Sequence, residues 1–324
     1  MNHPYRSIRV CFLALFTISF LTALPVCGGQ AKKSYSKVLI GRKHLRAQEG
    51  GGSPGEPAAS LLTGLDGRVV ELYEDVALVE INIRDKDELK NRGNQRSVLL
   101  DVQDDFDKVF LNGKTVDVRE ANGGLPGERP DPPYAGDESG TWLIQFVGPI
   151  KTEWLEAVKT AGIVPVQYVP SHTYIVGARE SAIRAVASLP YVQWISQMHR
   201  YLKPSVAGNA AARSIAAMNT ETVELWIELV QTSDTPDTIA RLQSLSAGAF
   251  ESEPWSDTEV RVQGVFETAD IDTILAEPLV FGLAERPTLD LSDERSVLAL
   301  TNIVPSLGAS AADAGKYKKW LSDL

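Results

Sequence analysis

The sequence predicts an α+β protein with two tandem ferredoxin-like modules, each with the order strand, helix, strand, strand, helix, strand. Two observations carry this prediction. Apolar residues in residues 141–203 change between strand and helix spacing in this order, and residues 221–290 repeat the order. The matching junctions at Pro190 and Pro278 lie 88 residues apart, and each precedes an apolar strand. This spacing indicates an internal duplication.

The first module has clear helix and strand signals. Trp154, Leu155 and Val158 share one face at helical spacing, Gly162 ends that helix, and Pro190 ends the next one. The expected strands are 142–148, 163–169, 173–178 and 191–196, and the expected helices are 151–161 and 180–189.

The second module repeats these elements. Thr235 and Pro236 open its first helix, and Pro278 follows the end of its second. The expected elements, in order, are the strand 222–230, the helix 235–247, the hairpin strands 249–255 and 259–267, the helix 269–276 and the strand 279–285.

The part before residue 141 is less regular. Residues 67–83 alternate like two strands, and Asn112-Gly113 predicts a hairpin turn within 109–118. Residues 32–64 are basic and then rich in Gly and Pro, which indicates a flexible leader. The chain is therefore expected to divide into a signal peptide (1–31), a flexible leader (32–64), a small β-rich module (65–120), a Gly/Pro linker (121–140), the first ferredoxin-like module (141–203), a linker (204–220), the second ferredoxin-like module (221–290) and a tail (291–324).

The first 31 residues have the layout of a secretory signal. Arg6 and Arg9 precede an uncharged apolar run over residues 10–27, and small residues follow. A membrane anchor is the alternative, because the run is just long enough to cross a bilayer. A lipoprotein signal that uses Cys27 ranks below simple export, because Val26 stands where a small residue is expected. The predicted location is secreted or periplasmic.

Charge and composition exclude several function classes. The formal net charge of −10 over 324 residues argues against nucleic-acid binding, which needs clustered Lys and Arg. Residues 141–200 hold five Lys and Arg against three acids, whereas residues 221–295 hold four against seventeen. This acidity indicates either a solvated surface or a docking face for a cationic or helix-N-terminal surface of a partner. Both explanations stay open.

No catalytic or cofactor site is predicted. His44, His172 and His199 lack metal-ligand spacing, and the acidic run 101–107 lacks the glycine and final Glu of an EF-hand. The phosphate-loop and nucleophile-elbow motifs are also missing. We therefore expect no catalytic, metal or cofactor residues.

Several segments resemble the region that precedes the catalytic domain in large secreted subtilisin-family serine peptidases. They are QFVGP (145–149), EWL (153–155), YVP (168–170), LPYVQW (189–194) and YLK (201–203). Residues 73–81 and 293–321 are also similar to parts of such precursors. The motifs that carry the family's Asp, His and Ser triad do not occur here, so no triad residue is assigned.

The resemblance implies a non-catalytic pro-region, which assists folding of a subtilisin-type catalytic domain and covers its cleft. An extended tail would lie in that cleft, after the first or the second module. The candidate cleft-binding residues are His199, Arg200, Tyr201, Leu202, Lys203, Arg286, Pro287, Thr288 and Leu289. The alternatives are a stand-alone exported protein-binding module and the truncated product of a gene for an active peptidase, in which residues 291–324 lead toward a missing catalytic domain.

Overall fold

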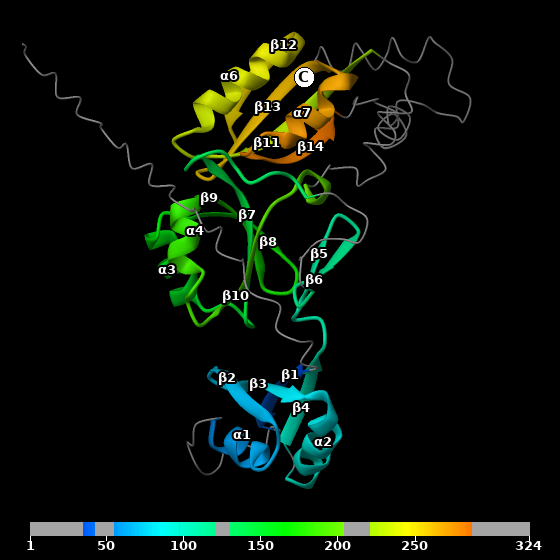
Figure 1. Cartoon of the computed structure of the whole chain (residues 1–324), viewed down its shortest axis with the longest axis vertical. Helices are drawn as coiled ribbons and strands as arrows, with labels where there is room; N and C mark the ends of the chain where they lie inside the picture. The colour runs from blue at the N-terminus through cyan, green and yellow to red at the C-terminus, as the bar shows by residue number, and fades with distance from the viewer. Residues whose placement is uncertain (1–34, 43–54, 97, 121–129, 204–220, 287–324) are drawn as a thin grey trace, which may run out of the picture.

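The computed structural model describes residues 35–42, 55–96, 98–120, 130–203 and 221–286. Within them the chain is an α+β protein of four-stranded antiparallel sheets and a separate two-stranded hairpin (Figure 1). The predicted fold class is confirmed at this level. No described helix is long and apolar enough to cross a membrane. The predicted signal peptide and the tail 291–324 lie outside the described residues.

The N-terminal unit is a four-stranded sheet with the strand order β2-β3-β1-β4. Its elements are β1 (Tyr35–Arg42), α1 (Gly55–Leu62), β2 (Gly67–Leu72), β3 (Val76–Asn82), the 3-10 helix η1 (Ile83–Asp85), α2 (Lys86–Gln95) and β4 (Val98–Gln103). Val38 and Ile40 of β1 are buried in the core formed with α1 and α2.

The prediction of a flexible leader over residues 32–64 is wrong for two of its parts. Residues 35–42 form β1, which pairs with β3 on one side and β4 on the other, and α1 begins at Gly55. The strand is only eight residues long, and basic residues surround it in the sequence. Its partners lie more than 30 residues away along the chain, so local composition did not reveal it.

The Asn112-Gly113 turn is confirmed. Both residues have positive φ, 53° and 69°, between β5 (Lys108–Leu111) and β6 (Lys114–Asp117), as a tight hairpin requires. The hairpin does not join the N-terminal sheet, and its apolar side packs on residues of the following module. The predicted boundary at residue 120 therefore separates two segments that share a core.

Module 1 has the predicted order of elements. They are β7 (Ser139–Phe146), α3 (Thr152–Thr160), β8 (Val164–Val169), β9 (Thr173–Arg179), α4 (Glu180–Val186) and β10 (Val192–Gln197), and the 3-10 helix η2 (Arg200–Leu202) follows. The strand order is β10-β7-β9-β8. Phe146, Trp154 and Val176 belong to the core between the sheet and its two helices.

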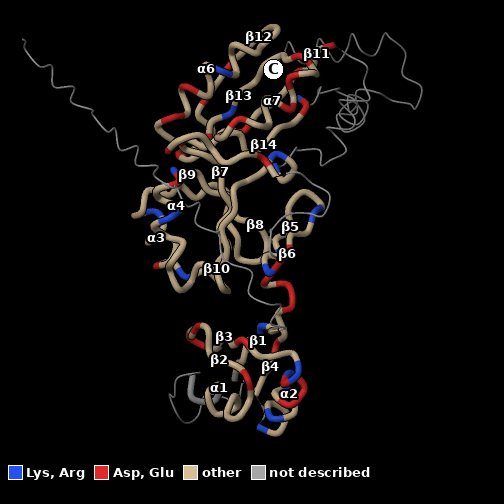
Figure 2. The backbone as a smooth tube through the Cα atoms, viewed as in Figure 1, with Lys and Arg blue, Asp and Glu red and all other residues tan. Residues whose placement is uncertain are grey.

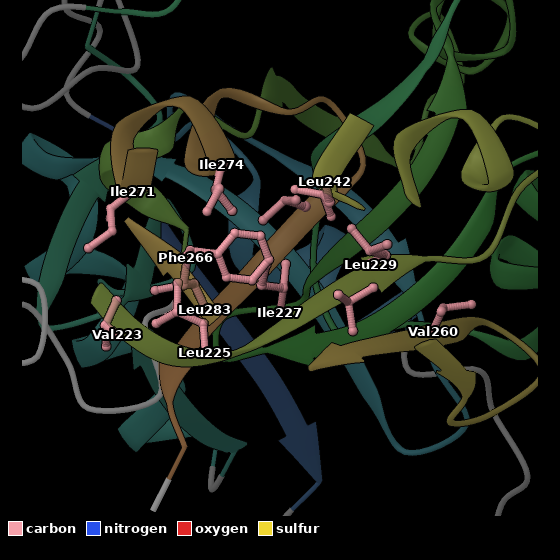
Figure 3. Packing of buried hydrophobic residues seen from close by; sticks show 12 residues of the cluster. Val223, Leu225, Ile227, Leu229, Leu242, Val260, Phe266, Ile271, Ile274 and Leu283 are labelled. Atoms are coloured by element: carbon pink, nitrogen blue, oxygen red, sulfur yellow. The ribbon is translucent and has the colours of Figure 1, made fainter. Parts of the chain in front are cut away.

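Module 2 repeats this order of elements. They are β11 (Thr222–Val230), α6 (Thr235–Leu245), β12 (Ser246–Pro254), β13 (Glu259–Glu267), the 3-10 helix η3 (Thr268–Asp270), α7 (Ile271–Ala276) and β14 (Val280–Glu285). Pro236 lies in the first turn of α6, as predicted. Figure 3 shows the core, in which Phe266 and Leu225 of the sheet meet Ile274 of α7. Each such fully buried side chain contributes about 1.5–3 kcal/mol.

Three units therefore share one order of elements, whereas the sequence predicts two. In chain order, the second strand of each unit lies beside the third, the third beside the first, and the first beside the fourth. Figure 1 shows the N-terminal unit, module 1 and module 2 following one another along the longest axis of the molecule. In each unit both helices pack on one face of the sheet, so the other face is available for contacts with a neighbour.

Candidate functional site

A cleft of about 510 Å³ lies where module 1 meets module 2, and its charged side chains bind one another. Arg179 and Asp234 form an ion pair with a nitrogen–oxygen distance of 2.9 Å. Arg241 pairs with Glu277, and Asp137 accepts hydrogen bonds from the backbone N–H and the hydroxyl of Ser181. The cleft is therefore a polar joint between modules. No group of three or more potential metal ligands occurs among the described residues.

His172 lies in the turn between β8 and β9 and contacts the ring of Phe106 edge-on, at a centroid distance of 4.3 Å. Burial and the charge of Lys37 lower the pKa of His172 to about 4, so the imidazole is neutral at pH 7. Its Nε2 atom is buried and, within the described part of the chain, has no hydrogen-bond partner. The imidazole is therefore packed against Phe106, with its Nε2 atom turned away from any orienting group in the described residues.

The first predicted cleft-binding tail is docked rather than extended. Leu202 and Lys203 are buried, and Lys203 Nζ donates a hydrogen bond of 2.7 Å to the carbonyl oxygen of Glu277 in module 2. Arg200 pairs with Asp131, and residues 200–202 form η2.

The neighbouring residues of this tail are held in the same way. His199 Nδ1 accepts a hydrogen bond of 3.1 Å from the backbone N–H of Asp131, and burial lowers the pKa of His199. Tyr201 stacks on His199, with Lys114 over its ring. The prediction that residues 199–203 form an extended tail is therefore wrong, because their apolar and charged groups are used to join two modules.

The second predicted tail begins where the described residues end. The backbone N–H of Arg286 donates to the carbonyl oxygen of Glu224, and its guanidinium pairs with the Glu224 carboxylate. Arg286 is thereby held beside β11. The other members, Pro287, Thr288 and Leu289, lie outside the described residues.

The helix-free face of the N-terminal sheet is covered by module 1. Lys37 of β1 donates to the carbonyl oxygen of Val147 at 2.9 Å, and its ammonium lies 3.2 Å from Asp107. Gln193 of module 1 donates to Asp107 and also accepts a hydrogen bond from Lys37. Leu78 of β3 packs so closely on Gly148 that no larger residue fits there. The two units are therefore joined by a buried polar cluster.

The helix-free face of module 1 is covered in turn. One buried cluster contains Leu143 and Ile175 of its sheet, Val116 of the β5–β6 hairpin, and Val230 and Phe281 of module 2. Gly177 of β9 is required there, because a Cβ at this position would overlap the side chain of Val230. The β5–β6 hairpin and module 2 therefore cover this face together.

The helix-free face of module 2 carries charged and aromatic side chains. Cross-strand pairing places Glu228, Arg261 and Glu253 in one row and Trp226, Gln263 and Glu251 in the next. We call this surface the acidic sheet face, and its residues are Glu224, Trp226, Glu228, Glu251, Glu253, Trp255, Glu259, Arg261 and Gln263. Figure 2 shows several acidic residues on module 2. Five carboxylates outnumber Arg261 and the neighbouring Arg286, which pairs with Glu224, so the surface is electronegative.

An aromatic stack lies on the acidic sheet face, beside the turn between β12 and β13. The guanidinium of Arg261 lies 3.5 Å from the ring centroid of Trp255 and 5.1 Å from that of Trp226. Burial raises the pKa of Glu228, although Arg261 favours its charged form. The acidity of this region is predicted by the sequence, but the stack is not. The alternation Glu224, Trp226, Glu228 is the signal that places three of these side chains on one face.

Comparison with known families gives one similarity. Residues 110–199 are similar to a family described as a domain of unknown function (DUF8729). The matched region joins the β5–β6 hairpin to module 1, which agrees with their common buried cluster. Neither the curated proteins nor the solved structures gave a match.

Proposed function

We propose that this chain is a non-catalytic pro-region of a secreted subtilisin-type serine peptidase, which helps the catalytic domain to fold and inhibits it. The strand orders β10-β7-β9-β8 and β12-β13-β11-β14 support ferredoxin-like modules, as the sequence resemblance implies. The N-terminal unit, with the order β2-β3-β1-β4, would be a third copy.

One observation carries the proposal. Each of the first two units buries the helix-free face of its sheet against the unit that follows it in the chain. The face of the N-terminal unit packs on module 1, and the face of module 1 packs on the β5–β6 hairpin and module 2. The acidic sheet face is the next in this series, and Trp255 on it is 56% exposed. A folded domain that follows or joins module 2 would complete the series there.

The physical role of such a face is to supply a preformed surface. A peptidase with many non-local contacts folds slowly, because its loops must close before these contacts form. A sheet that is already folded can hold part of the catalytic domain in place and lower this barrier. Arg286 is held beside Glu224, and we assign the cleft-binding role to the tail that begins with this residue.

A refolding experiment tests the proposal. A cognate subtilisin-type catalytic domain is denatured and diluted into native buffer with the chain, with an unrelated acidic protein, or alone. Folded enzyme is counted by active-site titration, and inhibition is measured with a peptide substrate. We expect the chain to raise the yield of folded enzyme and to inhibit it. If the chain neither assists refolding nor inhibits the enzyme, the proposal is wrong.

A further inference from the structure

We infer that Trp255 is the anchor of the acidic sheet face, and that its indole enters an apolar surface pocket with a basic rim on the partner. This inference rests on the proposed function, which identifies the partner as a catalytic domain. It adds the residue that carries the binding energy and the chemistry of the surface that receives it.

Trp255 has the exposure and the size of a binding anchor. It lies after β12, where its backbone N–H donates to the carbonyl oxygen of Glu259, and it is the most exposed large hydrophobic residue in the described part of the chain. An exposed indole loses apolar contact with water when a partner covers it. Tryptophan and arginine are also the residues most enriched among those that dominate binding energy at interfaces.

Arg261 holds the indole in place before a partner arrives. Its guanidinium lies 3.5 Å from the ring centroid of Trp255 and 5.1 Å from that of Trp226, and Trp226 donates a hydrogen bond of 3.2 Å from its Nε1 to Gln263. A cation–π contact of this kind is favourable, and it restricts the rotamers of the exposed ring. Binding then costs less side-chain entropy than it would for a mobile anchor.

The carboxylates around the stack favour a partner surface whose pocket is edged with basic residues. Glu228 and Glu253 flank Arg261 in its row of the sheet, and Glu259 lies on the same strand. Arg261 contacts both indoles, and the carboxylates on this face outnumber it, so negative charge dominates the field around the anchor. Such a surface attracts a pocket edged with Lys or Arg and repels an acidic one. A second copy of this chain would bring like charges together.

Binding of the variants to the catalytic domain tests the inference, with the active-site serine replaced by alanine to prevent cleavage. We expect Trp255→Ala to raise the Kd at least about 30-fold and Trp255→Phe to raise it less. Tyr168→Ala is the matched control, because Tyr168 is 50% exposed but lies on module 1. It should leave the Kd within about 3-fold of the original value. Circular dichroism verifies that each variant is folded.

A double-mutant comparison of Kd values tests whether Arg261 positions Trp255. Arg261→Ala should weaken binding in the original chain but not in the Trp255→Ala background, since the two residues act as one unit. Equal Kd values for the original chain and Trp255→Ala would overturn the inference while the proposed function stands.

No binding by the original chain would instead refute the proposed function. A dimer that Trp255→Ala abolishes, seen by light scattering, would assign the face to a second copy and overturn the inference.

Discussion

Lys203 shows how one buried side chain ties two modules together. It follows η2, donates to the carbonyl oxygen of Glu277, and is almost fully buried. Burial lowers its pKa from 10.5 to about 7, while Asp131 and Glu277 act in the opposite direction and Arg200 adds to the decrease. The sequence predicts that Lys203 belongs to an extended, cleft-binding tail. It could not reveal the joint, because Glu277 is 74 residues away.

The low pKa of Lys203 predicts a pH-dependent stability. Between pH 7 and 10.5 the unfolded chain binds the proton and the folded chain releases it, so stability rises with pH in this window. Lys203 should add about 2 kcal/mol to the free energy of unfolding between pH 7 and pH 9. Lys37, whose pKa burial also lowers to about 7, should add a similar amount. Urea denaturation at each pH measures this increase. Lys203→Met should reduce the total increase by about 2 kcal/mol, and the exposed control Lys159→Met should leave it unchanged. An undiminished increase in Lys203→Met would refute the assignment.

At the scale of the element, β1 shows what local patterns can and cannot predict. The order of elements in modules 1 and 2 follows from apolar spacing, Pro and Gly, all of which act within a few residues. β1 is different, because Lys37 interrupts its apolar pattern and its hydrogen-bond partners β3 and β4 come much later in the chain. The third copy of the unit was therefore missed.

The same limit applies to the acidic sheet face. The alternation of Glu224, Trp226 and Glu228 predicts one polar face of β11. The stack with Trp255 depends on the register that sets Glu228 opposite Arg261. Register is fixed by the fold of the whole sheet, so the sequence pattern alone predicts the acidity of the site but not its aromatic centre.

The place of β1 in the sheet makes a direct prediction. Ile40 is only 1% exposed, and Ile40→Ala should lower the free energy of unfolding by about 2–5 kcal/mol, because it leaves a cavity beside α1 and α2. Leu99→Ala on β4 is the control: Leu99 is 52% exposed, and its loss should change stability by less than about 0.5 kcal/mol. Chemical denaturation measures both. An unchanged stability of Ile40→Ala would mean that residues 35–42 do not form part of the core.

At the scale of the whole molecule, the three units form a chain of docked sheets. Polar joints hold them together, through Lys37 between the N-terminal unit and module 1 and through Lys203 between modules 1 and 2. Each unit retains a core of its own beneath its helices. A joint can therefore be weakened without unfolding the unit on either side.

Lys37→Met tests this property of the molecule. The substitution removes the donor to Val147 and Gln193 and leaves Asp107 paired with Arg119, which should cost about 1–3 kcal/mol of docking energy. Calorimetry should then show a separate transition for the N-terminal unit at lower temperature. Lys86→Met is the control, because Lys86 pairs with the exposed Asp104 and contributes less than about 1 kcal/mol. If the thermogram of Lys37→Met matches that of the original chain, the joint does not depend on this lysine.

We propose that the acidic sheet face of module 2 docks onto a subtilisin-type catalytic domain. Isothermal titration of the intact chain with a cognate catalytic domain, its active-site serine replaced by alanine, tests this claim most directly. We expect a one-to-one complex with a Kd below about 1 µM. The absence of any binding at about 100 µM would contradict it.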